Sequence, residues 1–374
     1  MTNVAAAGST PLPLDGVRVV ELDGGVATGY CTHLLAGFGA DVVQVGSPAL
    51  TADEARYLSR GKRQVEATEE SLRRLLDSAT VVVVGRPHAG PDSTRPPAEQ
   101  LFADHPHLVV TSITPFGLAG PHSEHRATNI VSFANGGIMA LTGEPDRPPL
   151  QTGGDQAWML GGLQGFAATT VALLGAMVQG EGDLIDISLQ ECGASMLEYC
   201  ASHWEYDSVL VERSGNTPRA EWGVYPVADG WAGVCCLGRQ LPNLLQLIGV
   251  EPEARWFDPV QRTAANEELF GEVLGFMIGH TKDELVAMGP ANKLPIGAVR
   301  TPAELVEHQP LVDRGFFDET PDGRLPGRPF PGFAWAELDP PAVVGVDDVL
   351  ATWGTTAVAR SSVTDFFSWL YSAK

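Results

Sequence analysis

The chain has 374 residues, of which 44% are hydrophobic, and carries a formal net charge of −22. This length exceeds the size at which one hydrophobic core usually suffices, so we expect two domains. The excess of acidic residues argues against a nucleic acid or an anionic membrane as a partner, because both require a positively charged surface. An anionic small molecule remains compatible with this charge if it binds at a local basic patch.

The cysteines and the N-terminal residues indicate in which cellular compartment the protein is expected. No two cysteines have CxxC spacing, and they occur at Cys31, Cys192, Cys200, Cys235 and Cys236. Residues 1–13 lack the basic and apolar regions of a targeting segment and are expected to form a flexible tail. We therefore expect reduced thiols packed in the core, a cytoplasmic location and no metal site.

The first part of the chain alternates strand and helix patterns. Residues 16–22 form a short β-branched run, residues 27–39 have helical spacing, and residues 40–45 form a second strand. The pattern repeats, with expected helices at 69–79 and 97–106 and expected strands at 80–85 and 107–114. Consecutive βαβ units build a parallel, doubly wound sheet, so the predicted fold class is α/β. The glycines after the first strand do not follow G-x-G-x-x-G, which argues against a dinucleotide site.

An uncharged run from Trp158 to Val178 approaches the length of a membrane span. Its glycines, Gly161, Gly162 and Gly165, make it only mildly apolar and favour close approach of a neighbouring element. We therefore predict a buried core helix rather than a membrane helix. Residues 183–191 are expected to form a strand that leads into another helix.

The middle of the chain has the pattern of a separate, smaller domain. Residues 219–236 are expected to form two strands around a turn at Asp229 and Gly230. Helices and connecting loops are expected within 242–250, 266–280 and 282–295. The aromatic residues of the hairpin, Trp222, Tyr225 and Trp231, are either the lining of a cleft or packing residues.

Nine segments, in order from about residue 12 to about residue 330, resemble the signature segments of the family III CoA-transferases. They read PLPLDGVRVVEL, LLAGFGADVVQV, SRGKRQV, HPHLVVTSITPFGLAGP, GGIMALTGEPDRPP, QGEGDLIDISLQE, VYPVADGWAGVCC, LPIGAVRTPAELVEHQPLVDRGFF and LPGRPF. This family includes formyl-CoA transferase, the carnitine CoA-transferases and α-methylacyl-CoA racemase.

The resemblance implies a fold, an assembly and a substrate class. It implies a large Rossmann-like domain built from residues 14–200 and 326–374, and a smaller α+β domain from residues 201–325. It also implies two subunits interlocked like links of a chain, either as a homodimer or with a homologous subunit. The implied co-substrate is coenzyme A or an acyl-CoA, and the implied partner molecule is a carboxylic acid or acyl thioester.

Transferases of this family use an aspartate that attacks the acyl-CoA thioester, giving a mixed anhydride and then an aspartyl-CoA thioester. Counting back from Gly162 without a gap places Trp158 at the nucleophile position, and a tryptophan cannot form an anhydride. Asp155 is the only nearby carboxylate, three residues earlier. It is either a displaced nucleophile or an N-terminal helix acid or cap.

The racemase branch of the family pairs a histidine with an aspartate to exchange a proton at the α-carbon. Alignment through Gly136 and Gly137 puts Thr128 and Asn129 at these two positions. His125 is nearby but out of register, and a lone loop histidine is typically solvated or structural. Racemase chemistry is therefore only the second alternative.

The expected CoA-binding positions also differ from the family pattern. The basic residues that remain are Arg60, Lys62, Arg63 and Arg86. Gly85, at the end of the expected strand 80–85, is the other candidate CoA-binding position. On so acidic a chain these cations are candidates for contacts with the CoA phosphates. The alternative is a solvated surface run.

Two functions of different classes remain open. The chain is either an enzyme that transfers CoA between carboxylic acids, or acts on an acyl-CoA thioester by non-standard chemistry, or it is a catalytically silent subunit of a hetero-oligomeric CoA-transferase. The missing nucleophile, the missing racemase pair and the altered CoA-binding positions favour something other than standard transferase chemistry. The signature segments that the chain retains favour a folded, working cleft.

Overall fold

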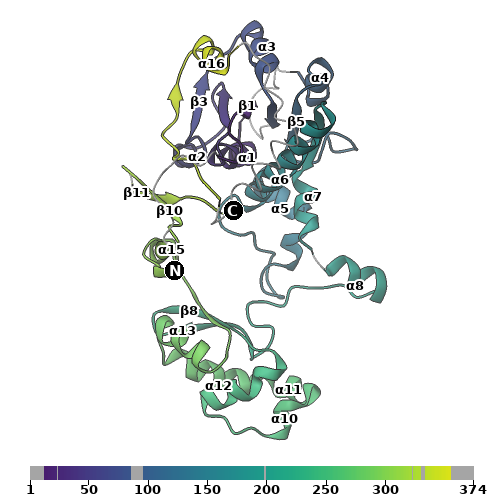
Figure 1. Ribbon diagram of the computed structural model, residues 1–374. Coiled ribbons are helices and arrows are strands. Elements are labelled where there is room, and N and C mark those ends of the chain that lie inside the picture. Colours follow the sequence, from purple (N-terminus) through teal and green to yellow (C-terminus); the bar gives the residue numbers. More distant parts are fainter. Residues whose placement is uncertain are drawn as a thin grey trace. The chain divides into compact units, whose positions relative to one another are not determined.

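The computed structural model describes residues 12–22, 24–85, 96–197, 199–321, 323–329 and 333–354. The chain divides into two compact units (Figure 1). Unit 1 contains residues 1–139, 151–210 and 328–374, and unit 2 contains residues 140–150 and 211–327. Both the N-terminal and the C-terminal parts of the chain therefore contribute to unit 1.

Unit 1 is built around a parallel sheet with strand order β12-β3-β2-β1-β4-β5-β6. Its strands are β1 (Arg18–Leu22), β2 (Asp41–Val45), β3 (Lys62–Val65), β4 (Val81–Gly85), β5 (Val109–Thr114), β6 (Asp183–Ser188) and β12 (Ala342–Val343). Its helices are α1 (Val26–Gly37), α2 (Ala52–Leu58), α3 (Glu69–Ser78), α4 (Ala98–Asp104), α5 (Asn129–Asn135), α6 (Gln156–Gln179), α7 (Leu189–Ser195), α8 (Cys200–Asp207) and α16 (Val346–Trp353). The predicted α/β class and parallel sheet are confirmed.

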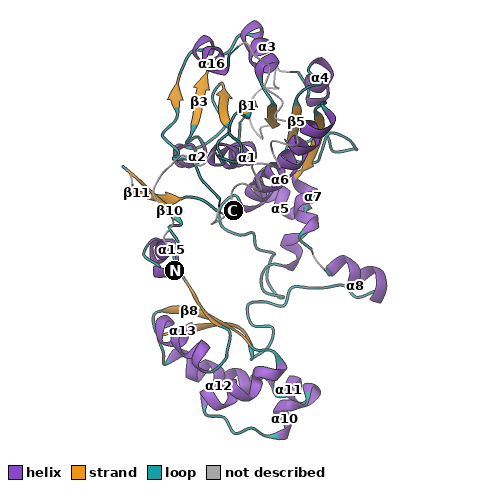
Figure 2. Cartoon of the chain, viewed as in Figure 1, coloured by secondary structure: helices purple, strands orange, loops and turns teal. Residues whose placement is uncertain are grey.

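Each face of this sheet is covered by helices, because the β-branched strand residues alternate between the two faces. Val20, Val43 and Val82 pack in one core cluster with residues of α3, α4 and α16. Val19 and Val42 pack in the other with residues of α1, α6 and α7. Figure 2 shows the strands of this sheet with helices around them. The strand order reverses direction between β1 and β4, and the carboxyl ends of strands at such a switch point are where ligands bind in open α/β sheets.

Helix α6 is buried on one side only, which corrects the expectation of a buried core helix. The buried residues of α6 are Ala157, Gly161, Gly162, Gly165, Thr169 and Leu173. On another side Val171 and Val178 are 71% and 62% exposed. Among the described residues α6 alone is long and apolar enough to cross a membrane, a property that it shares with core helices of other proteins.

The glycines of α6 allow α1 to approach closely, as predicted. A Cβ atom on Gly162 would lie 2.5 Å from the Ala27 carbonyl oxygen and 3.0 Å from the Tyr30 Cβ. A Cβ atom on Gly165 would lie 2.7 Å from Ile113 Cδ1. Backbone atoms of α1 cannot move aside without shifting the helix, so glycine is required at position 162.

We expect Gly162→Ala to destabilise the protein by about 1–3 kcal/mol, because the added methyl group forces α1 and α6 apart. Gly175→Ala is the matched control on the same helix, since a Cβ atom there meets nothing within 4 Å. This control should raise the free energy of unfolding by up to ~1 kcal/mol through helix propensity. Denaturant unfolding of both variants checks the result, and equal effects would contradict the close packing.

Unit 2 contains a three-stranded antiparallel sheet, β7-β8-β9, and a two-stranded ribbon, β10-β11. Its strands are β7 (Trp222–Val227), β8 (Gly230–Cys235), β9 (Ile296–Val299), β10 (Phe317–Thr320) and β11 (Gly323–Pro326). Its helices are α9 (Leu241–Ile248), α10 (Ala254–Phe257), α11 (Pro259–Ala264), α12 (Asn266–Ile278), α13 (Lys282–Ala291), α14 (Pro302–Val306) and α15 (Gln309–Asp313). Short 3-10 helices occur at Ile138–Leu141 and Gly238–Gln240. The predicted hairpin is β7-β8, but its turn residues are Ala228 and Asp229 instead of the expected Asp229 and Gly230, because Gly230 pairs with Val227 as the first residue of β8.

Candidate functional site

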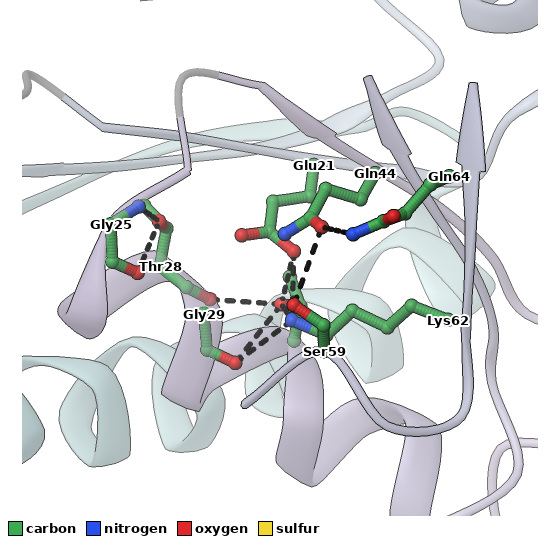
Figure 3. A network of polar contacts seen from close by, with 9 residues as sticks. Glu21, Gly25, Thr28, Gly29, Gln44, Ser59, Lys62 and Gln64 are labelled. Atoms are coloured by element: carbon green, nitrogen blue, oxygen red, sulfur yellow. Dashed lines mark hydrogen bonds and ion pairs between the residues drawn. The ribbon is translucent and has the colours of Figure 1, made fainter. Parts of the chain in front are cut away.

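A row of polar side chains crosses three neighbouring strands near the carboxyl end of β1. Glu21 pairs in register with Gln44, and Gln44 pairs with Gln64, so the three side chains lie on one face of the sheet. The Gln64 Nε2 donates a hydrogen bond of 2.8 Å to the Gln44 Oε1 (Figure 3). This face is the one covered by α1, which places polar groups beneath a helix in an otherwise apolar core.

The centre of this row is a fully buried ion pair between Glu21 and Lys62. The Lys62 Nζ donates to the Glu21 Oε2 at 2.8 Å, to the Thr32 Oγ1 at 2.7 Å and to the Gly29 carbonyl oxygen at 3.0 Å. Both charged side chains are 0% exposed. Burial lowers the pKa of Lys62 below its ordinary value, while the neighbouring Glu21 carboxylate acts in the opposite direction.

Two atoms of the same network have no hydrogen-bond partner among the described residues. They are the Glu21 Oε1 and the Gln44 Nε2. A Cβ atom on Gly24 would lie 2.8 Å from the Glu21 Oε1, so the loop after β1 approaches the network closely and requires glycine there. The network therefore joins the loop between β1 and α1 to β2 and β3.

Cys31 and His33 lie on α1 and are shielded from solvent. Burial raises the pKa of the Cys31 thiol to about 12, so this cysteine is not a thiolate nucleophile at neutral pH. Burial first, and then the nearby Lys62 and Arg60 cations, lower the pKa of His33 to about 3. Within the described part of the chain neither ring nitrogen of His33 has a hydrogen-bond partner, and its ring lies 4.5 Å from that of Tyr57.

The expected basic cluster is split by the fold. Lys62 points toward α1, whereas Arg63, the next residue of β3, points to the opposite face of the sheet. The Arg63 guanidinium forms a two-pronged ion pair with Asp41, at 3.1 and 2.6 Å, and donates to the Thr352 hydroxyl at 2.8 Å. Both cations thus have intramolecular partners, and a phosphate would have to displace them.

The remaining predicted CoA-binding positions are Arg60, Gly85 and Arg86. Arg60 is buried, with 7% of its surface exposed. Gly85 is the last residue of β4 and lies at its carboxyl end, beside the switch point of the sheet. Arg86 lies outside the described residues. Phosphate contacts from Arg60 and Arg86 stay predictions.

The N-terminus of α6 brings together the residues singled out for catalysis. Asp155 is the N-cap residue and is half-buried, but its side chain does not make the cap hydrogen bond. The Asn129 amide does so instead: its Oδ1 accepts from the Trp158 N–H at 3.2 Å, and its Nδ2 donates to the Gly154 carbonyl oxygen at 3.1 Å. The helix end is therefore stabilised by a residue outside the helix.

The racemase-pair positions receive a different role from this geometry. Asn129 is buried and uses its amide as both a donor and an acceptor in the cap, while Thr128 is exposed and is the N-cap of α5. An amide and a hydroxyl do not exchange protons near neutral pH as a histidine and carboxylate do. Sequence reasoning missed the capping role of Asn129, since 29 residues separate it from Trp158.

His125 is not a lone histidine in the structure. Its Nδ1 lies 2.9 Å from the Nδ1 of His122, so one of the two must donate and the other accept. The pair lines a cavity of ≈ 390 Å³ together with Phe116, Arg126, Val131 and Asn135. The lining residues of this cavity follow β5 in the chain, and the spacing of the two histidines is the sequence signal that could have indicated it.

The three hairpin aromatics of unit 2 have different roles. Tyr225 is a packing residue, with no exposed surface and a hydroxyl that donates 2.6 Å to the Ala220 carbonyl oxygen. Trp222 lines a cavity, and Trp231 is 53% exposed. No group of three or more metal-binding side chains occurs among the described residues.

Comparisons with known proteins agree with this fold. The family model of CoA-transferase family III matches residues 14–343. The chain is 28% identical over 341 residues to succinyl-CoA–D-citramalate CoA-transferase of Chloroflexus aurantiacus, covering 81% of this chain and 82% of the relative. It is 26% identical over 358 residues to subunit BbsE of succinyl-CoA:(R)-benzylsuccinate CoA-transferase of Thauera aromatica, covering 84% and 86%.

A solved structure extends the agreement to three dimensions. The crystal structure of a CAIB/BAIF family protein from Brucella suis matches with a TM-score of 0.79 and 27% identity, and covers 92% of this chain and 100% of that chain. The family model spans most of the sequence, and the fold has the expected parallel sheet. The chain therefore belongs to CoA-transferase family III and is a CoA-transferase-like protein of acyl-CoA metabolism.

Proposed function

We propose that this chain transfers CoA between carboxylic acids, with Asp155 as the carboxylate that carries the acyl group and then CoA. The observation that carries the proposal is the arrangement at the N-terminus of α6. Asp155 lies three residues before Trp158, the position of the family's nucleophile, and Asn129 supplies the helix cap. The positive end of the helix dipole favours the ionised carboxylate, which is the form that attacks a thioester.

In the proposed reaction an Asp155 oxygen attacks the thioester carbonyl carbon of the donor acyl-CoA. The C–S bond breaks, CoA leaves as a thiolate, and a mixed anhydride forms on Asp155. The thiolate then attacks the Asp155 carbonyl carbon, which releases the first acid as a carboxylate and leaves an aspartyl-CoA thioester. The acceptor carboxylate repeats these steps in reverse, so every bond broken is matched by one formed and no external reductant or oxidant is needed.

The proposed CoA site lies at the carboxyl ends of β1 and β4, where the strand order reverses. Gly85 lies there, and Gly24 and Gly25 precede the N-terminus of α1. Arg60 and Arg86 are the proposed phosphate contacts. Lys62 instead joins β1 to α1 through its hydrogen bonds to Glu21 and to the Gly29 carbonyl oxygen, and so holds both ends of the loop between them.

We test the proposal by incubating the protein with succinyl-CoA and quenching with hydroxylamine, which converts an aspartyl thioester or anhydride to a hydroxamate. Peptide mass spectrometry is expected to find the hydroxamate on Asp155. Asp155→Asn should lose the label and lower CoA transfer by a factor of about 10³ or more. Asp146→Asn, at an exposed acid, is the control and should keep both. A label on another residue, or unchanged transfer by Asp155→Asn, would exclude the proposed nucleophile.

A silent subunit is the second candidate, and Trp158 at the nucleophile position favours it. The Thauera aromatica relative is itself named a subunit. The apolar residues Val171, Leu174 and Val178 form an exposed stripe along α6, which supports an interface with a second copy or a homologous subunit. Failure of the isolated chain to bind CoA in calorimetric titration, with activity restored by a homologous subunit, would favour this candidate.

A cytoplasmic location is also proposed, supported by the five free cysteines.

A further inference from the structure

The three-stranded sheet of unit 2 has one face that is not covered by the helices of its core. Tyr225, Ala232 and Val234 belong to the core cluster, which also contains residues of α9, α12 and α13. Strand residues alternate between faces, so Trp222, Gly233 and Gly297 lie on the opposite face. A cavity of ≈ 730 Å³ lies over this sheet, within the range of about 300–1,000 Å³ that small-molecule sites occupy.

The floor of this cavity is a pair of glycines that the protein itself does not require. Gly233 and Gly297 are directly opposite each other on β8 and β9. A Cβ atom on Gly297 would meet nothing within 4 Å, and one on Gly233 would meet only backbone oxygens at 3.9 Å. Neither has a positive φ. Gly223 differs, because a Cβ atom there would lie 2.4 Å from Thr217.

Glycine inside a strand lowers stability, since it has more freedom to lose on folding and no side chain to pack. Two paired strand glycines without a steric or conformational need are therefore unfavourable for the fold alone. Strand glycines of this kind occur where a ligand or another backbone approaches closely. The bare floor formed by Gly233 and Gly297 indicates such an approach.

The wall of the cavity is aromatic and held in place. Trp222 is 42% exposed, and the Arg219 guanidinium carbon lies 5.3 Å from the centroid of its ring, in cation–π contact. Cys235 is opposite Trp222 across the β7-β8 pair. The residues that line the cavity are uncharged, and they are Ser214, Gly215, Asn216, Pro218, Trp222, Gly223, Val224, Gly233, Val234, Cys235, Pro295, Ile296 and Gly297.

We propose that this cavity binds the planar aromatic group of a carboxylic acid or of its acyl thioester. The flat ring lies on Gly233 and Gly297, where a side chain would hold it away, and packs against the indole of Trp222. An uncharged lining matches an uncharged ring, since a charged group would lose its hydration there without compensation. The inference names the substrate class and rests on the proposed function only for turnover, because binding is measured without any reaction.

The test compares two acids of similar size, trans-cinnamate, which is flat, and 3-cyclohexylpropanoate, which is not. Titration calorimetry of the full chain is expected to show about fivefold tighter binding of cinnamate, from aromatic packing on Trp222 and the floor. Trp222→Leu should remove this preference. Gly297→Val should abolish cinnamate binding while leaving the thermal unfolding midpoint unchanged or raised, because the added side chain meets no atom of the unit at its Cβ.

Gly275→Ala, on α12 of the same unit, is the matched control, since its Cβ also meets nothing within 4 Å. It should leave cinnamate binding unchanged. Equal affinity for the two acids, or full cinnamate binding by Gly297→Val, would overturn the proposal. A change of oligomeric state in Gly297→Val without a change in cinnamate binding would also overturn it and would assign the face to a second protein chain. None of these readouts depends on Asp155, so they separate this inference from the proposed function.

Discussion

Lys62→Met is expected to destabilise the protein by about 3–5 kcal/mol, because it leaves the Glu21 carboxylate buried without its counter-charge. A loss of this size is a large part of the ~5–15 kcal/mol that holds a typical domain folded. The Thr32 hydroxyl still donates to Glu21 at 2.8 Å, but one neutral hydrogen bond does not compensate for a lost cation. Denaturant unfolding followed by circular dichroism measures the change.

Two further variants separate the buried pair from charge effects in general. Lys62→Met combined with Glu21→Leu should recover most of the lost stability, because a buried pair replaced by apolar side chains is often neutral. Arg56→Met removes the Arg56–Asp53 pair, whose side chains are 54% and 91% exposed, and should change stability by less than ~1 kcal/mol. If Lys62→Met behaved like Arg56→Met, the buried pair would not have the structural role assigned to it.

The stability of unit 1 is expected to fall with acid through His33. In the folded chain burial lowers the pKa of His33 to about 3, while in the unfolded chain it titrates near its ordinary value of 6.5. Between these two values the unfolded chain binds more protons, so the free energy of unfolding decreases as the pH falls from about 6.5 to about 3. The slope is about 1.4 kcal/mol per pH unit, and the full effect is on the order of 4 kcal/mol.

His33→Phe removes this titration and fills the space between Tyr57 and Trp335 with another ring. The difference in unfolding free energy between the variant and the original chain should be constant above pH 7 and should move in favour of the variant at lower pH. His33→Gln, which is polar but does not titrate, should show the same pH dependence. His107→Phe, at an exposed histidine, is the control for replacing a histidine by phenylalanine elsewhere in unit 1. A parallel pH profile for the original chain and His33→Phe would contradict this prediction, because it would mean that His33 binds its proton at the same pH in the folded and the unfolded chain.

Most strands of the unit 1 sheet were predictable because their residues are strongly β-branched or apolar. β1, β2, β4 and β5 coincide with such runs. β3 was not predicted, since its charged start, with Lys62 and Arg63, has the composition of a surface segment. It becomes a strand because Glu21 and Asp41 on neighbouring elements neutralise these charges. An acid inside the apolar run of β1 was the one local sign of such a partner.

At the candidate site the sequence identified the important positions but not their contacts. Asp155 was expected either to cap α6 or to act on substrate, and the structure gives the cap bond to Asn129. His125 was expected to be a lone loop histidine, and its contact with His122 depends on the path of the loop after β5. Hydrogen bonds between residues far apart in the chain have no periodicity that a sequence pattern could reveal.

By itself the sequence determined the α/β class, the order of most strands and helices, the close approach at the α6 glycines and membership of the family, because these depend on local residue patterns. Only the tertiary structure decided which groups the charged and polar side chains contact. Glu21 and Lys62 are 41 residues apart, and they meet because β1 and β3 flank β2 and lie under the same helix. Lys62 and Arg63 are adjacent in sequence yet lie on opposite faces of the sheet, since strand geometry alternates side chains and the neighbouring elements supply their counter-charges.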